Sequence, residues 1–213
     1  MSRTTKAFAS CIALALSCQG GFADTVREAA LKSHPSQGEV HAIQGARVAL
    51  ATSTAGVHFD FQSAELHPGH AYTLLMAVMN RPSECPALPC TPKDVLGRSD
   101  IVRSDVGVVG GAVARADGTL YITGIQKVGA LPEAFFGHGL QDPPAAEIHF
   151  VLNDHGPAIE GRMVEMLGTY RGGCTDESLP PPMPAAARAS GNTGPNTCRL
   201  VQNVQFLPER PES

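Results

Sequence analysis

The most restrictive feature of this chain is the octet LHPGHAYT at residues 66–73, which leads directly into the apolar run 74–79. Pro68 and Gly69 favour a tight turn. Tyr72 then opens an apolar segment, where its ring can be buried while its hydroxyl hydrogen-bonds back to the backbone of the turn. The spacing L-x-P-G-x-x-Y therefore predicts a tyrosine corner.

Tyrosine corners recur in Greek-key β-sandwiches of the immunoglobulin and fibronectin III-like kind. Several other segments favour the same all-β class. Residues 57–62 (VHFDFQ) and 146–153 (AEIHFVLN) alternate between apolar and polar side chains, which is the pattern of half-buried strands. Segment 72–79 is apolar on both faces, as in a central strand, and 200–207 is expected to be the last strand. The predicted fold is a Greek-key β-sandwich.

Two hairpins are predicted from turn signals. Residues 46–52 and 57–62 flank Ala55 and Gly56, and residues 106–116 and 119–125 flank the dipeptide Asp117-Gly118. Aspartate and glycine tolerate the positive φ angles of a two-residue hairpin turn. We therefore expect each pair of segments to form adjacent strands.

The first 23 residues have the order of a secretory signal. Arg3 and Lys6 precede the apolar stretch 7–16, and small residues end at Ala23, after which we expect cleavage. In the alternative, Cys18 becomes a lipidated N-terminus and anchors the protein to a membrane. No apolar run reaches the about 20 residues of a membrane-spanning helix, so we predict no transmembrane segment and a secreted or periplasmic location.

Composition shifts divide the rest of the chain. Residues 24–39 combine a short helix-compatible piece with Pro, Ser and Gly, and are predicted to form a flexible N-terminal arm. Residues 40–207 are expected to form a single β-sandwich domain, and 208–213 a tail. Within the domain, residues 163–170 fit a strand or a short helix, and the Pro/Ala-rich segment 175–197 reads as a low-complexity loop that packs no core.

The cysteines predict covalent links. Cys85, Cys90, Cys174 and Cys198 remain after removal of the signal, and an even number in an exported chain favours disulfides. Four cysteines allow three connectivities. Pairing Cys85 with Cys90 and Cys174 with Cys198 is preferred, because each pair brackets a loop with no apparent structure of its own.

Charge and motifs exclude several classes of function. Removal of residues 1–23 takes away two of the 16 basic residues and none of the 20 acidic ones, so the net charge moves from −4 to −6. A nucleic-acid partner is not expected, because phosphate binding needs a basic surface. The sequence has no G-x-S-x-G elbow, zincin helix, P-loop or dinucleotide fingerprint, and it identifies no catalytic residue.

The motifs LxPGHAYT at 66–73, AEIH at 146–149 and DHGP at 154–157, together with Asn80, Pro82 and the Gly-Gly-Cys ending at Cys174, carry a resemblance to a known group. The chain resembles a family of exported bacterial proteins of unassigned function. The resemblance covers most of the predicted domain and implies export and an all-β fold. It implies no chemistry.

Three histidines are the candidate functional residues. His70 follows the corner turn, His149 shares a strand face with Glu147, and His155 follows Asp154 in the next turn. If the strands that carry them are neighbours, three imidazoles could bind zinc or copper. Histidines that bond to turn backbone are the simpler interpretation, so a non-catalytic module that binds an unidentified protein or small ligand through its loops is the preferred function. A small metalloprotein using His70, His149 and His155 is the alternative.

Overall fold

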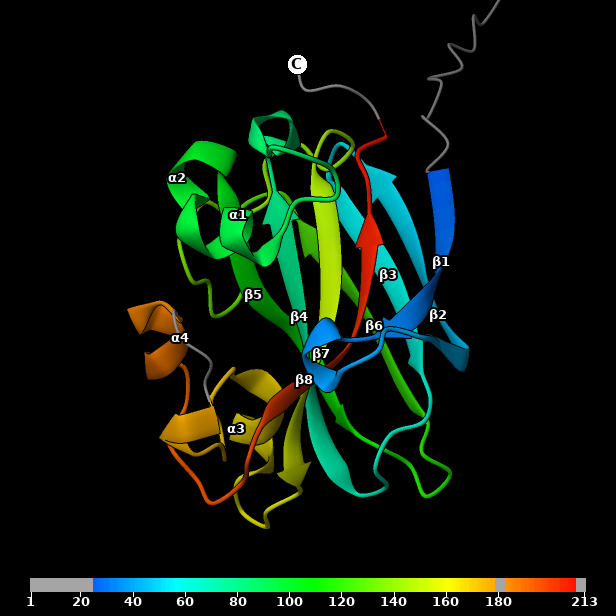
Figure 1. Ribbon diagram of the computed structural model, residues 1–213, viewed down its shortest axis with the longest axis vertical. Coiled ribbons are helices and arrows are strands. Elements are labelled where there is room, and N and C mark those ends of the chain that lie inside the picture. Colours follow the sequence, from blue (N-terminus) through cyan, green and yellow to red (C-terminus); the bar gives the residue numbers. More distant parts are fainter. Residues whose placement is uncertain (1–24, 179–182, 210–213) are drawn as a thin grey trace, which may run out of the picture.

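One antiparallel sheet dominates the computed structural model, which describes residues 25–178 and 183–209. Its eight strands are hydrogen-bonded in the order β5-β4-β7-β8-β1-β2-β3-β6. The strands are β1 (Thr25–Ser33), β2 (Ala42–Ser53), β3 (Gly56–Ser63), β4 (His70–Met79), β5 (Ser104–Val113), β6 (Leu120–Lys127), β7 (Glu147–Pro157) and β8 (Arg199–Phe206). The edge strands β5 and β6 contact each other, so the sheet is nearly closed into a barrel (Figure 1).

Short helices occupy the connections. They are η1 (Pro35–Gln37), η2 (Pro82–Glu84), α1 (Pro92–Gly97), α2 (Ser99–Val102), α3 (Met163–Gly168), η3 (Asp176–Ser178) and α4 (Ala185–Ala189). In Figure 1, α1 and α2 lie near one end of β4 and β5, and α3 and α4 lie towards the other end. The ambiguous segment 163–170 is thus mostly helical. The predicted loop 175–197 carries α4, whose Ala187 is buried in a core, contrary to the expectation that this loop packs none.

The sheet has an apolar cluster on each face. Side chains of β4 alternate between the two: Leu74 and Met76 belong to the inner core, which also holds Phe59 and Phe150. The intervening residue Leu75 belongs to a smaller cluster on the outer face, beneath the helices. β4 is therefore a central strand covered on both faces, as its continuous apolar sequence predicts.

The tyrosine corner is present. The backbone N–H of His67 donates to the Tyr72 hydroxyl oxygen at 3.1 Å, and the Tyr72 side chain is buried. Gly69 has a φ of 77°, which a residue with a side chain adopts only with strain. Burial, with Asp154 as the second cause, raises the pKa of Tyr72, so the hydroxyl stays protonated.

The protein is mostly β, as predicted, but the Greek-key sandwich of two packed sheets is not confirmed. All eight strands belong to one hydrogen-bonded sheet, and β4 and β7, which follow the corner and the AEIH motif, are neighbours within it. A local turn motif fixes how the chain enters a strand. It does not fix which strands share a sheet.

Residues 25–33 form β1, where the sequence predicts a flexible arm. Val26 to Ala30 pair with β2, and Lys32 and Ser33 pair with β8. Leu31 is completely buried in the inner core. The helix-compatible composition of this segment is overridden because a strand here fills the gap between β8 and β2 and satisfies backbone groups of both.

Of the two predicted hairpins, one forms. β2 and β3 pair from Arg47–Gln62 to Ser53–Gly56, whereas β5 pairs with β4 and β6 pairs with β3. The turn at Asp117-Gly118 is present, but the corner loop is inserted beside it, since Leu66 N–H donates to Gly118 O and Gly69 N–H donates to Ala114 O. These contacts take the place of a ladder between β5 and β6.

Both preferred disulfides are confirmed. Cys85 is bonded to Cys90 between β4 and α1, and Cys174 is bonded to Cys198 at the start of β8. The second bond ties the segment that carries α4 to the sheet.

Candidate functional site

A cavity of about 760 Å³ lies on the outer face of the sheet. Its floor is formed by residues of β4, β7 and β8, and its walls by α1, by the segments around Phe135 and Tyr170, and by residues of η1 and η3. Most of the lining is apolar, including Leu75, Ala77, Val106, Phe135, Val151 and Leu200. This volume is within the about 300 to 1,000 Å³ typical of small-molecule sites.

The α1 wall is fixed at its first turn. Asp94 accepts hydrogen bonds from the Thr91 hydroxyl at 2.7 Å and from the Thr91 backbone N–H at 3.0 Å, and the bond from the backbone N–H is one half of a capping box. These bonds from Thr91 lower the pKa of Asp94, so its carboxylate stays charged and also binds Arg98. The capped helix places Lys93 and Val95 in the cavity wall.

Buried Asp105 fixes the wall around Phe135. Its carboxylate accepts from the backbone N–H groups of Phe136 at 3.0 Å and Gly139 at 2.7 Å, while Phe135 N–H donates to Val106 O. Phe135 is thereby held edge-on against Tyr170, with ring centroids 5.3 Å apart. Burial raises the pKa of Tyr170 to about 12, so this cavity-lining phenol is neutral.

His149 lines the floor of the cavity and is paired with Glu147, which is not itself part of the lining. Glu147 is completely buried, and its Oε1 lies 2.5 Å from His149 Nε2. Oε1 also accepts the Cys90 backbone N–H at 2.8 Å, and the other carboxylate oxygen, Oε2, is buried with no hydrogen-bond partner. His149 is 8% exposed, and it lines the cavity.

The Cys85–Cys90 disulfide supports this pair. The bond restricts the conformations of the loop between η2 and α1, and the Cys90 N–H of this loop donates to Glu147. The strand pattern predicted that His149 and Glu147 share a face. The contact of Glu147 with Cys90 was not predicted, although a glutamate between Ala146 and Ile148 in a buried strand is a signal of a partnered carboxylate.

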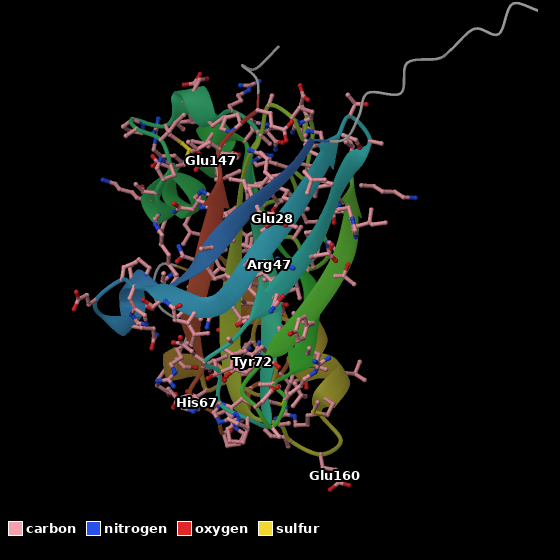
Figure 2. All side chains as sticks on the ribbon, turned by 90° about the vertical axis from the view of Figure 1, so that its right-hand side faces the viewer. Glu28, Arg47, His67, Tyr72, Glu147 and Glu160 are labelled. Atoms are coloured by element: carbon pink, nitrogen blue, oxygen red, sulfur yellow. A yellow bond between two sulfur atoms is a disulfide. The ribbon has the colours of Figure 1, made fainter. Side chains whose placement is uncertain are left out.

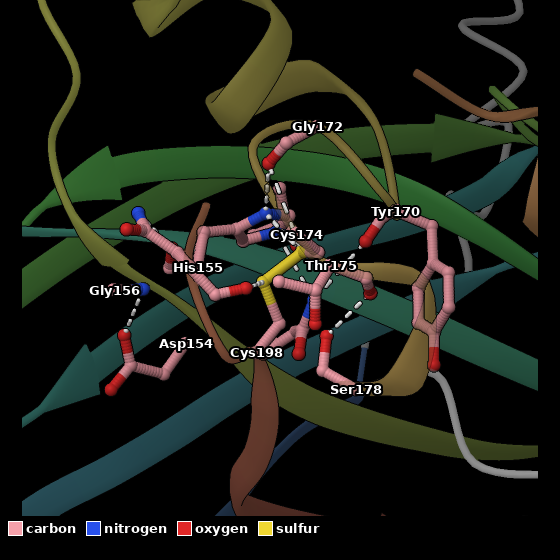
Figure 3. Close-up of a disulfide and its surroundings, with 12 residues drawn as sticks. Asp154, His155, Gly156, Tyr170, Gly172, Cys174, Thr175, Ser178 and Cys198 are labelled. Carbon is pink, nitrogen blue, oxygen red and sulfur yellow. Dashed lines mark hydrogen bonds between the residues drawn. A yellow bond between two sulfur atoms is a disulfide. The ribbon is translucent and has the colours of Figure 1, made fainter. Parts of the chain in front are cut away.

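His155 lies elsewhere on the outer face, packed against the Cys174–Cys198 disulfide (Figure 3). Its Nδ1–H donates to Gly172 O at 2.7 Å, and its Nε2 accepts from the Thr73 hydroxyl at 2.8 Å. Burial lowers the pKa of His155, which favours the neutral ring that this bonding pattern requires. Both ring nitrogens are occupied, so the role of His155 is structural.

His70 is the partly buried first residue of β4, and its Nδ1 is 3.0 Å from a carboxylate oxygen of Asp154. Asp154 precedes His155 on β7, and neighbouring side chains of a strand point to opposite faces of the sheet. His70 and His155 are therefore on opposite sides. Figure 2 shows Glu147 towards one end of the molecule and His67, whose ring centroid lies 4.9 Å from that of His70, towards the other.

The three histidines do not share a metal centre. His149 and His155 are six residues apart on one strand, a separation of about 20 Å at the rise of about 3.3 Å per residue. Among the described residues, the one group of three potential ligands within 4.8 Å consists of His155, Cys174 and Cys198. Its two sulfur atoms are bonded to each other and offer no thiolate to a metal.

Comparison with protein-family models, curated proteins and solved structures finds no match to this chain. Within the part of the chain that the structure describes, no helix has the length and apolar character needed to cross a membrane.

Proposed function

We propose that this chain is an exported, non-catalytic binding protein whose outer-face cavity holds a small, largely apolar molecule. The observation that carries the proposal is a cavity of about 760 Å³ with a mostly apolar lining and, in its floor, His149 paired with buried Glu147. Few, well-placed polar groups in an apolar cavity are typical of sites that bind small molecules. The alternative metalloprotein receives no support from the positions of His70, His149 and His155.

The loops supply the walls and the sheet supplies the floor. This division agrees with the expectation that loops on a rigid β scaffold carry binding. Both disulfides adjoin the site: Cys90 donates its backbone N–H to Glu147, and Cys198, next to β8, lines the cavity.

Filling the cavity tests the proposal. The apolar fluorescent anion 1-anilinonaphthalene-8-sulfonate is expected to bind the native protein with a stoichiometry of one, and Val151→Phe is expected to weaken this binding at least tenfold, because the larger side chain occupies the floor. Ile125→Phe is the matched control: it makes the same kind of change on a strand, at a side chain that is 72% exposed on β6 and outside the cavity. Fluorescence titration gives the affinities. Equal weakening by both variants would contradict the proposal.

Export is proposed from residues 1–23, which lie outside the described residues, as does Cys18. The two disulfides suit an oxidising compartment. We expect the mature protein to begin at Asp24, which intact-mass analysis of protein purified from the producing cell would show. A mature chain that begins with a lipid-modified Cys18 would instead show a membrane-anchored form. A chain that retains residues 1–23 would contradict the proposal of export by a cleaved signal.

A further inference from the structure

We propose that the cavity selects amphipathic molecules that end in a carboxylate, and that the Nδ1–H group of His149 recognises this end. The inference rests on the proposed function and names the ligand class of the same cavity. It follows from which oxygen and nitrogen atoms of the Glu147–His149 pair can carry protons.

The first step is the charge of the pair. Glu147 is completely buried, so an isolated carboxylate there would be costly unless a cation compensates it. The contact with His149 at 2.5 Å provides this compensation within the pair. The pair is therefore most stable with a net charge of zero, which requires two protons to be shared between one carboxyl group and one imidazole.

The second step places the two protons. One lies in the hydrogen bond between Glu147 Oε1 and His149 Nε2, bonded to either atom. A proton on Glu147 Oε2 would be a buried donor without an acceptor, because that oxygen has no hydrogen-bond partner. The second proton is consequently on His149 Nδ1, whichever atom holds the first.

The groups that line the cavity determine what the Nδ1–H of His149 can bind. His149 lines the cavity, and its Nδ1 has no hydrogen bond to any residue in the described ranges. Lys93 lies in the wall and forms no ion pair with a described residue, whereas the guanidinium of Arg199 lies near Asp154 and His67. Glu177 is the acidic residue of the lining, and it is exposed. A carboxylate can accept from Nδ1–H, Lys93 adds a positive charge to the wall of the same cavity, and charge-assisted hydrogen bonds are the stronger ones.

The ligand class follows from these groups. The apolar part of the lining fits a hydrocarbon body, and the Nδ1–H of His149 fits an acceptor at one end. Decanoate and 1-decanol are suitable probes, because they share a chain and differ in whether the polar end is an anion or a hydroxyl. Each is measured by displacement of the fluorescent sulfonate, below its aggregation limit.

The native protein is expected to bind decanoate at least tenfold more tightly than 1-decanol. In Glu147→Gln, the new amide oxygen still accepts from Cys90 N–H and from His149 Nε2–H, but His149 is then neutral and its Nδ1 lacks a proton. The preference for decanoate is expected to fall at least tenfold, while 1-decanol, which can donate to Nδ1, keeps its affinity. A purely structural role of Glu147 would weaken both probes alike.

Glu28→Gln is the matched control, because it makes the same chemical change on a strand, at an exposed residue of β1 outside the cavity, and it should retain the preference. If Glu147→Gln fails to fold, the double variant Glu147→Leu/His149→Phe replaces the buried pair by apolar side chains and should bind 1-decanol without any preference for decanoate.

The remaining outcomes separate the two proposals. Equal binding of both probes by the native protein, or an unchanged preference in the variants of Glu147, would overturn the inference and leave the cavity as a binding site. Absence of binding by the fluorescent sulfonate and by both probes would overturn the proposed function itself.

Discussion

Replacing Cys174 and Cys198 by alanine is expected to lower the free energy of unfolding by about 3 to 4 kcal/mol, because a bond that closes a loop of this length removes conformations of the unfolded chain. The two residues are 24 apart in sequence, whereas Cys85 and Cys90 are 5 apart. The same replacement at Cys85 and Cys90 is the matched control and is expected to cost about 2 kcal/mol.

Urea denaturation at pH 7 measures both losses. The Cys174–Cys198 bond also anchors the segment that buries Ala187 against the outer-face cluster, so its removal should loosen a wall of the cavity as well. A smaller loss for this double variant than for the Cys85 and Cys90 control would contradict the assignment of the larger effect to the longer loop.

Acidification from pH 6.5 towards pH 5 is expected to reduce the free energy of unfolding by up to about 1.4 kcal/mol per pH unit for each buried neutral histidine. His155 is the main candidate, since burial lowers its pKa in the folded state and its Nδ1–H already donates to Gly172 O. Below the pKa that His155 has in the unfolded chain, the unfolded state therefore binds a proton that the folded state does not. The free energy of unfolding then decreases as the pH is lowered. Burial also lowers the pKa of His34, which adds to the slope in the same direction.

Urea denaturation at pH 7, 6 and 5 checks this expectation. His155→Gln should be less stable than the native protein at pH 7 and should show a smaller slope with pH. His58→Gln, at an exposed position on β3, should keep the native slope. A native protein whose stability is constant between pH 7 and pH 5 would show that His155 carries no such linkage.

Features that depend on residues close together in the sequence could be predicted from sequence patterns. Alternation in 146–153 is realised in β7, where Phe150 is in the inner core and His149 is on the outer face. The corner bond between His67 and Tyr72 is likewise a short-range contact that the spacing L-x-P-G-x-x-Y prescribes. Both disulfides belong to the same group, because each closes a loop within one stretch of chain.

Long-range pairing could not be predicted in this way. Residues 25–33 have a composition that fits a helix, and they become a strand because β2 and β8 leave a place for one. Two apolar segments joined by Asp117-Gly118 fit a hairpin, yet β5 and β6 pair with different partners because the loop at Leu66 lies between their ends. Which strands become neighbours therefore depends on how all eight strands fit into the sheet.

In the candidate site, too, the short-range feature could be predicted and the long-range one could not. His149 and Glu147 are two residues apart on one strand, so their position on a shared face could be predicted. The cavity above them could not, because Lys93, Phe135 and Tyr170 come from separate connections that meet only in the folded protein. For the same reason the three histidines suggested one centre in the sequence and occupy three separate environments in the structure.

The position of β1 between β8 and β2 has a consequence for biosynthesis. β1 is the first strand of the described chain and β8 the last, and they pair at Lys32–Asn203 and Ser33–Gln202. Until the segment that forms β8 is available, both β1 and β7 have an open edge, and open strand edges favour aggregation. The two parts of the sheet are therefore joined only when β8 pairs with both edges, and until then each edge is exposed to self-association.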